Sequence, residues 1–423
     1  MTPKKNNEGS ALQNFLGALD ARATSSLCVI HVNLVVYALC YWMTQPVLPF
    51  LTRELGADAV IFGWLQTTFS FVQLVGGPVI GRVCDTKGAR LALVVSQVGA
   101  AASYLLMGSA NNLPVLFASR LPTLLMHSMH AAQAFVTDFS TPELRALALG
   151  RLTLSYGVGM VVGAPLGGWL SGKTGYHGVA LAAGCISLAT VPLTCAVLPA
   201  GRVLKKTSED DGAAQMKNRM SKALGPLKDL LVQSAPRNIL SFKIILGLGL
   251  AMQSSMQSML MRDKFELSAK SLGFIQSGAG GVSVVSNTFV VGWLVSIASE
   301  SQLMIGSTVL LMATLAGLAL THSYQIMLVL LVPMMISTSC MYTLTTAYIT
   351  KSVDAANTGT AIGLDHATRS FCGMIAPIVG GYVYREYGHD AVSVGASVLV
   401  GIAAVFWQIT QVGARRSAVT KAD

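Results

Sequence analysis

The sequence predicts an all-α polytopic membrane protein with twelve transmembrane helices in two pseudo-symmetric six-helix bundles. Three observations support this fold class: twelve apolar stretches, a scarcity of charged residues, and motifs that recur at half the chain length. Charged residues make up 11% of the chain and hydrophobic residues 52%, whereas a soluble domain carries about a quarter charged residues. Because a soluble chain this apolar would expose large adhesive patches, lipid is the better solvent for it.

Twelve segments have the length and composition of membrane-spanning helices, which need about twenty mostly apolar residues. The expected spans are 27–50, 59–82, 91–110, 114–137, 147–171, 178–198, 238–261, 271–296, 302–321, 325–349, 359–383 and 391–412. They form an N-terminal bundle at 27–198 and a C-terminal bundle at 238–412, joined by a polar cytosolic linker at 199–237. The segments 1–26 and 413–423 are expected to be cytosolic tails.

The distribution of Lys and Arg sets the expected orientation, since these residues accumulate in cytosolic loops. With the N-terminus inside, 19 of the 29 fall on the cytosolic side, six on the opposite side and four within helices. This bias predicts that both termini are cytosolic and that the number of crossings is even. We expect a multi-pass protein of the plasma membrane, with the apical membrane or an intracellular membrane as alternatives.

The two bundles share sequence at a nearly constant offset. Four glycines of the first bundle (Gly150, Gly167, Gly168 and Gly175) have glycine counterparts 213 residues later, and residues 62–66 resemble residues 272–276 at an offset of 210. Such offsets indicate duplication of a six-helix unit. Parallel repeats place a ligand site between the halves, near the middle of the membrane.

A tight charged turn follows the second span, with the sequence Gly-Arg-Val-Cys-Asp-Thr-Lys-Gly-Ala-Arg over residues 81–90. It resembles the signature G-x-x-x-D-(R/K)-x-G-(R/K)-(R/K) of the major facilitator superfamily. The matching residues are Gly81, Asp85, Gly88 and Arg90. Thr86 and Ala89 stand where that signature has basic residues.

This resemblance implies a conformational latch on the cytosolic side. Asp85 would lie against the positive N-terminus of the eleventh helix near residues 357–360, and Arg145 of the next cytosolic loop would be a second partner. The contact would hold the two halves together in an outward-open state. A basic loop that only sets topology is the alternative interpretation.

The fifth span carries a glycine and proline pattern that resembles the antiporter signature of the same superfamily, with the proline displaced by one position. Its residues are Gly150, Gly159, Gly163, Pro165, Gly167 and Gly168. A helix of this kind bends at proline and packs closely along its glycine face. The pattern favours exchange transport, and a kinked packing helix without a special role is the alternative.

These motifs identify the chain as similar to the drug–proton antiporter-like members of the superfamily. The resemblance implies a major facilitator fold, a small organic cation as substrate, protons as the coupling ion, the lipid bilayer as surroundings and a functional monomer. It implies no cofactor. The seven cysteines form no CxxC pair, so no zinc site is expected. No pattern suggests an enzyme or a nucleic-acid partner.

Polar residues of the fourth span are candidates for the substrate or proton pathway, because ionisable groups in lipid are costly and usually face a bundle interior. Arg120, Thr123, His127 and His130 are spaced by three or four residues, which predicts one helix face. Histidine gains and loses protons near neutral pH. The alternative is a pair of packing histidines with Arg120 near the membrane surface.

The eleventh span supplies a second group of candidates, Asp365, His366 and Arg369. Asp365 would bind a proton or a cationic substrate, or it would form a closed pair with Arg369 four residues later. Further candidates to line the cavity are Gln66, Gln276 and Asn33. Lys243 is expected to extend its ammonium group to the cytosolic interface.

Three functions remain open at this point. The first is export of organic cations or drug-like amphipathic solutes in exchange for protons by alternating access. The second is a membrane scaffold or regulator that keeps the fold without transport. The third is transport of anionic or neutral solutes, for which Arg120 and Arg369 would be anchors.

Overall fold

The structure is a computed structural model that describes residues 21–139, 142–199, 233–353 and 358–420. Every regular element in these four ranges is helical, as predicted. In lipid, each backbone N–H and C=O must find its partner within its own segment, and a helix satisfies both.

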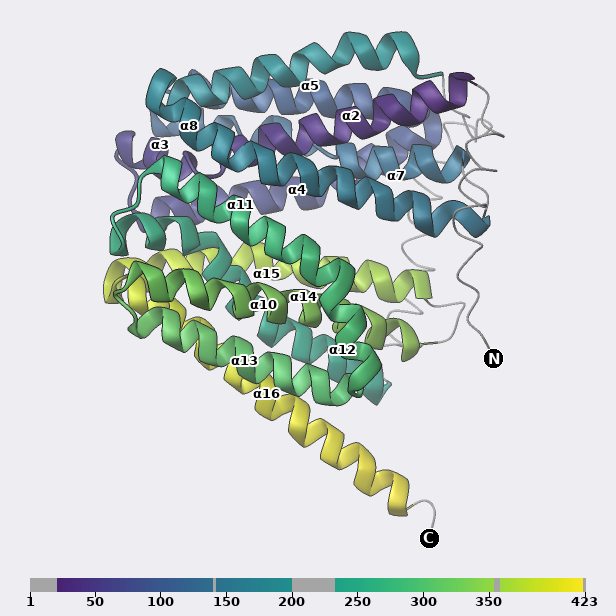
Figure 1. Ribbon diagram of the computed structural model, residues 1–423, viewed down its shortest axis with the longest axis vertical. Helices are drawn as coiled ribbons and strands as arrows, with labels where there is room; N and C mark the ends of the chain where they lie inside the picture. Colours follow the sequence, from purple (N-terminus) through teal and green to yellow (C-terminus); the bar gives the residue numbers. More distant parts are fainter. Residues whose placement is uncertain (1–20, 140–141, 200–232, 354–357, 421–423) are drawn as a thin grey trace.

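The helices fall into two sequential sets. The N-terminal half contains α2 (Ala21–Thr44), α3 (Leu48–Glu54), α4 (Ala59–Lys87), α5 (Ala89–Gly108), α6 (Leu113–Ala118), η1 (Leu121–Leu125), α7 (Ser128–Phe139) and α8 (Pro142–Val197). The C-terminal half contains α10 (Ser234–Lys264), α11 (Ala269–Val285), η3 (Ser286–Val290), α12 (Val291–Ile297), α13 (Glu300–Leu320), α14 (Tyr324–Lys351), α15 (Thr358–Tyr387) and α16 (His389–Thr420). Figure 1 shows the two halves one above the other.

Twelve crossings can be followed along the chain. Within the described ranges, nine helices are long and apolar enough to cross a membrane. One of them, α8, contains two crossings, because its backbone turns at Gly175, where φ is 70°. The predicted fourth span is divided among α6, η1 and α7, and α15 is the eleventh, so the total agrees with the predicted twelve.

The fourth crossing corrects the sequence-based expectation of a continuous helix over 114–137. The α-helix stops at Ala118, a 3₁₀ helix follows, and Met126 leaves helical geometry before α7 begins at Ser128. Pro122 lies at the start of the 3₁₀ helix and cannot donate a backbone hydrogen bond. The prediction that Arg120, Thr123 and the two histidines share one helix face was therefore wrong.

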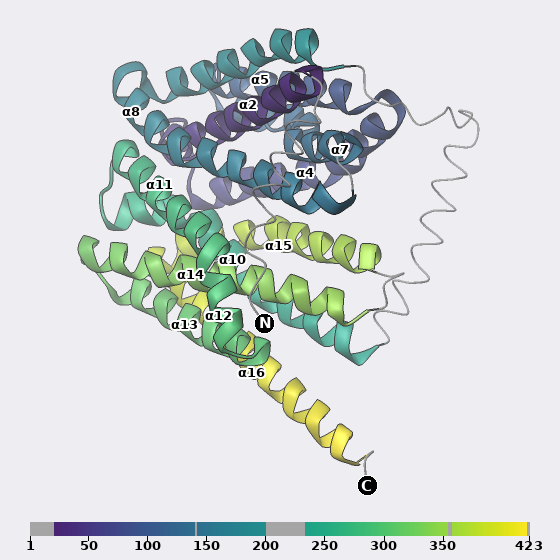
Figure 2. The ribbon, with the colours of Figure 1, turned by 45° about the vertical axis from the view of Figure 1, so that its right-hand side comes forward.

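Two further boundaries differ from the expected ones. The first helix begins at Ala21 and the last one continues to Thr420, so both enter segments that were expected to be tails. Figures 1 and 2 show the end of α16 projecting beyond the bundle. The interior of the expected linker lies outside the described residues.

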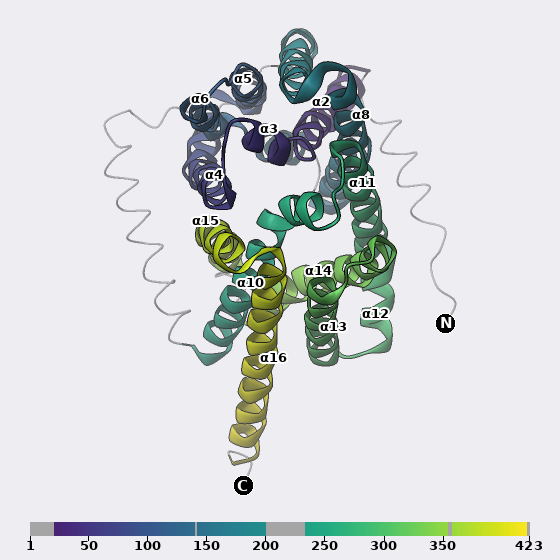
Figure 3. The same ribbon diagram turned by 90° about the vertical axis from the view of Figure 1, so that its left-hand side faces the viewer.

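The halves meet along two helix pairs, α4 with α15 and α8 with α11. Figure 3 shows both pairs end-on. At one crossing Gly63 lies against the carbonyl oxygen of Pro377, and at the other Gly273 lies against the carbonyl oxygen of Ala164. Any side chain at either glycine would collide with backbone, which explains why glycine is needed at both positions.

The connections that precede α4 and α11 also correspond at an offset of 210. Gly56 and Glu266 both adopt positive φ, at 80° and 53°. Asp58 caps α4 by accepting a hydrogen bond from Ile61 N, and Ser268 caps α11 in the same way. These shared details support duplication of the six-helix unit at the level of local geometry.

Candidate functional site

A polar cluster joins the two halves at the face that carries α3 and the connection between α10 and α11. The charge distribution predicts that this face is non-cytosolic, and we call it the outer face. Arg262, at the end of α10, is only 8% exposed. Its guanidinium donates to the carbonyl oxygen of Pro49 in α3 and binds Asp263 with a 2.6 Å contact from Nε to Oδ1.

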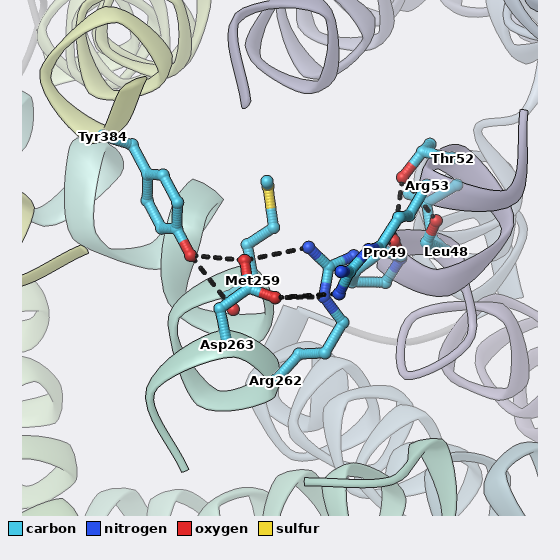
Figure 4. Close-up of polar contacts among 8 residues, drawn as sticks. All are labelled: Leu48, Pro49, Thr52, Arg53, Met259, Arg262, Asp263 and Tyr384. Atoms are coloured by element: carbon cyan, nitrogen blue, oxygen red, sulfur yellow. Dashed lines mark hydrogen bonds and ion pairs between the residues drawn. The ribbon is translucent and has the colours of Figure 1, made fainter. Parts of the chain in front are cut away.

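The same carboxylate gathers two more side chains. The Tyr384 hydroxyl donates to Asp263 Oδ2 at 2.6 Å, and Arg53 Nη1 lies 3.6 Å from Oδ1. We call Pro49, Arg53, Arg262, Asp263 and Tyr384 the outer clamp (Figure 4). Since α3 belongs to one half and α10 and α15 to the other, the clamp holds the outer face closed.

A second tie at the outer face is weaker. Arg385 Nη1 lies 3.7 Å from Asp58 Oδ2, and both side chains are nearly half exposed. Exposed ion pairs of this kind contribute little to stability because water screens them. The buried Arg262 contact is therefore the stronger of the two.

A small pocket in the N-terminal half surrounds Arg120. It is lined by side chains of α2, α3 and the turn between them, α4, α5 and the fourth crossing, among them Tyr41, Gln45, Gln66, Tyr104, Arg120 and Thr123. Three of the sequence candidates thus lie together, although not on one helix face. Arg120 is 7% exposed, its Nη2 contacts Met107 Sδ at 3.5 Å, and its Nε has no partner among the described residues. None of the residues that line this pocket is acidic.

The two histidines of the fourth crossing form a separate pair at the start of α7, with His127 immediately before its first residue. The His127 and His130 rings are stacked, with centroids 5.2 Å apart and planes at 15°. His127 is buried against α4, where the Gly76 backbone makes room for its ring, and His130 is exposed. His130 of α7 and His366 of α15 lie in opposite halves.

Asp365 is buried in the C-terminal half, with 4% of the residue exposed. It forms an ion pair with Lys243 of α10, and Thr346 Oγ1 of α14 lies 3.4 Å from Oδ2 as a donor. The expected pair between Asp365 and Arg369 is therefore replaced by a pair with a different helix. Arg369 instead places its guanidinium 4.2 Å from the ring centroid of Tyr342.

Lys243 also differs from expectation. Its ammonium group does not reach the membrane surface but binds Asp365, and only 13% of the side chain is exposed. The neighbouring helix offers a carboxylate at the same depth, which is a stronger partner than the interface. Lys243 is thus a site residue that sequence reasoning missed, although a lysine in an apolar run and an aspartate in another were both visible.

The remaining cavity candidates occupy different surroundings. Asn33 donates to Thr194 Oγ1 at 2.9 Å inside the N-terminal bundle, where Gln97 contacts the same hydroxyl. Gln276 donates to Ser258 Oγ at 3.0 Å. Asn33 does not line the Arg120 pocket, so only Gln66 of these three joins a cluster of candidates.

The charged segment 81–90 is helical as far as Lys87, where α4 ends, and the chain turns at Gly88. Gly88 adopts φ of 87° between α4 and α5, a conformation that favours glycine. Arg90 donates to the carbonyl oxygen of Cys195, and Asp85 is exposed. Residue 357 and the side chains of Arg145 and residues 358–360 lie outside the described residues, so the latch itself stays a prediction.

The glycine pattern of α8 is a packing surface. Gly159, Gly163 and Gly167 lie against the backbone carbonyl oxygens of Val35, Leu39 and Met43 in α2. Gly168 faces α11, and Gly150 has open space where a side chain would begin. Pro165 follows the carbonyl of Ala164 that Gly273 approaches. The close packing expected of this motif is present along most of its length.

Comparison with known sequences identifies the family. The sequence profile described as Major Facilitator Superfamily matches residues 30–250 and 239–422. Human Solute carrier family 67 member A1 is 35% identical over 409 residues, covering 93% of this chain and 94% of that protein. Mouse Solute carrier family 22 member 18 is 35% identical over 369 residues, covering 85% and 90%. Multidrug resistance protein 1 of Bacillus subtilis is 24% identical over 363 residues, covering 85% and 90%.

Solved structures share the architecture. A bacterial homolog of the human lysosomal transporter Spinster, in an inward-facing and occupied conformation, gives a TM-score of 0.74 at 13% identity, covering 93% of this chain and 98% of that one. The human organic anion transporter MFSD10 gives 0.64 at 17% identity, covering 92% and 100%. These likenesses show the fold, and the sequence matches show the ancestry. The chain therefore belongs to the Major Facilitator Superfamily of membrane transporters, and not to a class of enzymes.

Proposed function

We propose that this chain is a secondary active transporter that exports organic cations or drug-like amphipathic solutes in exchange for protons. The observation that carries the proposal is Asp365, a carboxylate 4% exposed within a membrane helix and bound to an ammonium group. A buried carboxylate is tolerated only with a positive partner. A proton or the cationic group of a solute can each take that place.

Alternating access supplies the movement in this proposal. The outer clamp keeps the outer face closed in the structure described here, and the predicted Asp85 latch would close the opposite face. Binding between the halves would bias the two states through their differential affinity for substrate and proton. We propose His127, His130 and His366 as the proton relay, because the first two rings stack on each other and His366 directly follows Asp365 on α15.

The similarity of this chain to named transporters supports the proposal that it exports solutes. Two of the similar proteins are named as solute carriers and one as a multidrug resistance protein. We also propose a plasma-membrane location and a functional monomer, and the bias of Lys and Arg toward one side supports cytosolic termini.

Flux through the purified protein in proteoliposomes tests the proposal. An imposed proton gradient should drive movement of a fluorescent organic cation in the opposite direction, and Asp365→Asn should abolish it while insertion stays normal. The amide keeps the shape of the carboxyl but carries no negative charge and takes up no proton. Unchanged flux in Asp365→Asn would refute the role of the carboxylate, and no flux in the wild-type chain would favour a scaffold role.

Transport of anionic solutes is the second candidate, favoured by the Arg120 pocket. A guanidinium buried in a pocket without an acidic residue gains a counter-charge if the solute carries one. Arg120→Gln should then lower uptake of an anionic dye at least about tenfold and leave uptake of a cationic dye unchanged. Equal uptake of the anionic dye by both proteins would exclude this function.

A further inference from the structure

Lys243 occupies a position that a purely structural lysine seldom takes. It is nine residues after Ser234, where α10 begins, so it lies about 14 Å from the inner end of the helix. Asp365 is seven residues after Thr358, where α15 begins, about 10 Å from the same face. The ion pair therefore lies inside the bundle, in the part nearer the cytosolic side.

The pair is enclosed by three helices of the C-terminal half, α10, α14 and α15, which pack on one another (Figure 2). From α14 it receives the hydroxyl of Thr346, and the neighbouring Tyr342 holds Arg369. From α15 itself, His366 and Arg369 follow Asp365 by one and four residues. Among the described residues of these three helices, the basic groups near Asp365 are Lys243, Arg369 and His366.

One carboxylate therefore faces an excess of positive groups, of which only Lys243 binds it directly. Removing one partner of a buried pair is costly because it leaves an uncompensated charge. Replacing that partner by another cation avoids the cost. The lysine stem has four rotatable carbons and can carry a released ammonium toward the cytosolic interface.

From this geometry we infer that Lys243 is a tethered competitor for Asp365, displaced when a proton or the cationic group of a solute binds the carboxylate. The inference rests on the proposed function and adds a second residue to its site. In the empty transporter Lys243 is paired with the Asp365 carboxylate. A solute must therefore bind Asp365 more strongly than Lys243 does in order to displace it. It is a specificity-determining residue for positive charge, since a neutral solute cannot compensate Asp365.

Neutral substitution of Lys243 tests this role. In Lys243→Met and Lys243→Gln, the concentration of organic cation that half-saturates flux should fall at least about tenfold, as expected for a close charge pair. Protons should also bind Asp365 more readily, so the pH at which they half-inhibit substrate binding should rise by about one unit. Both quantities are measured in proteoliposomes, normalised to folded protein.

Two control variants separate competition from a structural role. Lys243→Arg keeps the positive charge and should retain the wild-type pH profile. Lys351→Met removes a lysine of a largely exposed pair with Glu300 and should change neither quantity. If Lys243→Met or Lys243→Gln only lowers thermal stability, with unchanged half-saturation and pH profile, Lys243 is structural and the inference fails.

The outcome for the wild-type chain is read separately. If it transports no organic cation, the proposed function fails before Lys243 is considered. If it transports and the neutral variants match it, only the competitor role is overturned. Binding of the same cation to purified protein gives a second measurement for any variant whose flux is too low.

Discussion

Gly150 and Gly167 belong to one sequence motif but meet different surroundings in α8. A side chain at Gly167 would collide with the carbonyl oxygen and neighbouring backbone atoms of Met43 in α2. At Gly150 no atom of the described residues lies within 4 Å of the place where a side chain would begin. The motif therefore combines a position that fixes a helix crossing with one that does not.

Alanine substitution should separate the two positions. Gly167→Ala forces α2 and α8 apart and should cost about 1–3 kcal/mol, the usual effect of overpacking. Gly150→Ala should be neutral or slightly stabilising, since alanine is the better helix former. Thermal unfolding of the two purified variants in detergent measures the difference, and equal midpoints would contradict the packing interpretation.

The outer clamp depends on the short helix α3. Pro49 stands in its first turn, where a proline costs no hydrogen bond, and the carbonyl oxygen of Pro49 accepts from Arg262. Arg53 in the last turn reaches Asp263. One seven-residue helix thus presents both a carbonyl and a cation to the end of α10.

Loss of the buried arginine should open the outer face. Arg262→Met removes the hydrogen bond to Pro49 and the main partner of Asp263, so the outward-open population should rise at least about tenfold. Spin labels at the exposed residues Glu54 and Lys270, in a chain whose seven native cysteines are replaced, report the distance across the face. Longer distances are expected.

The matched control is Arg385→Met, which removes the exposed tie to Asp58. It should leave the distance distribution nearly unchanged, because water already screens that pair. If Arg262→Met behaves like Arg385→Met, the clamp does not hold the halves together.

The sequence predicts that the fourth crossing exists, but it does not predict that the helix is interrupted within it. Its apolar length predicts a crossing, and the crossing exists. Its interruption depends on how the backbone accommodates Pro122, and a proline in an apolar run is compatible with a kink, a 3₁₀ turn or a complete break. The place of Arg120 in its pocket follows from that break, so residue spacing could not predict it.

At the scale of the whole molecule, the feature best predicted from the sequence is the duplication of the six-helix unit. The offsets of 210 and 213 predict two equivalent halves, and the glycine contacts at Gly63 and Gly273 match that equivalence. Partners between helices are less predictable, because they depend on how each helix is rotated. Asp365 lies four residues from Arg369 and 122 from Lys243, yet the distant lysine is its partner.

The outer clamp contains a consequence of this equivalence. Arg53 and Asp263 are 210 residues apart and therefore occupy corresponding positions in the two halves, and they contact each other. A residue that touches its own counterpart lies at the pseudo-twofold axis, where an ancestral pair of identical halves would have placed like residues together. Opposite charges there make the pairing heterotypic. Two N-terminal halves would set arginine against arginine and two C-terminal halves aspartate against aspartate at this position.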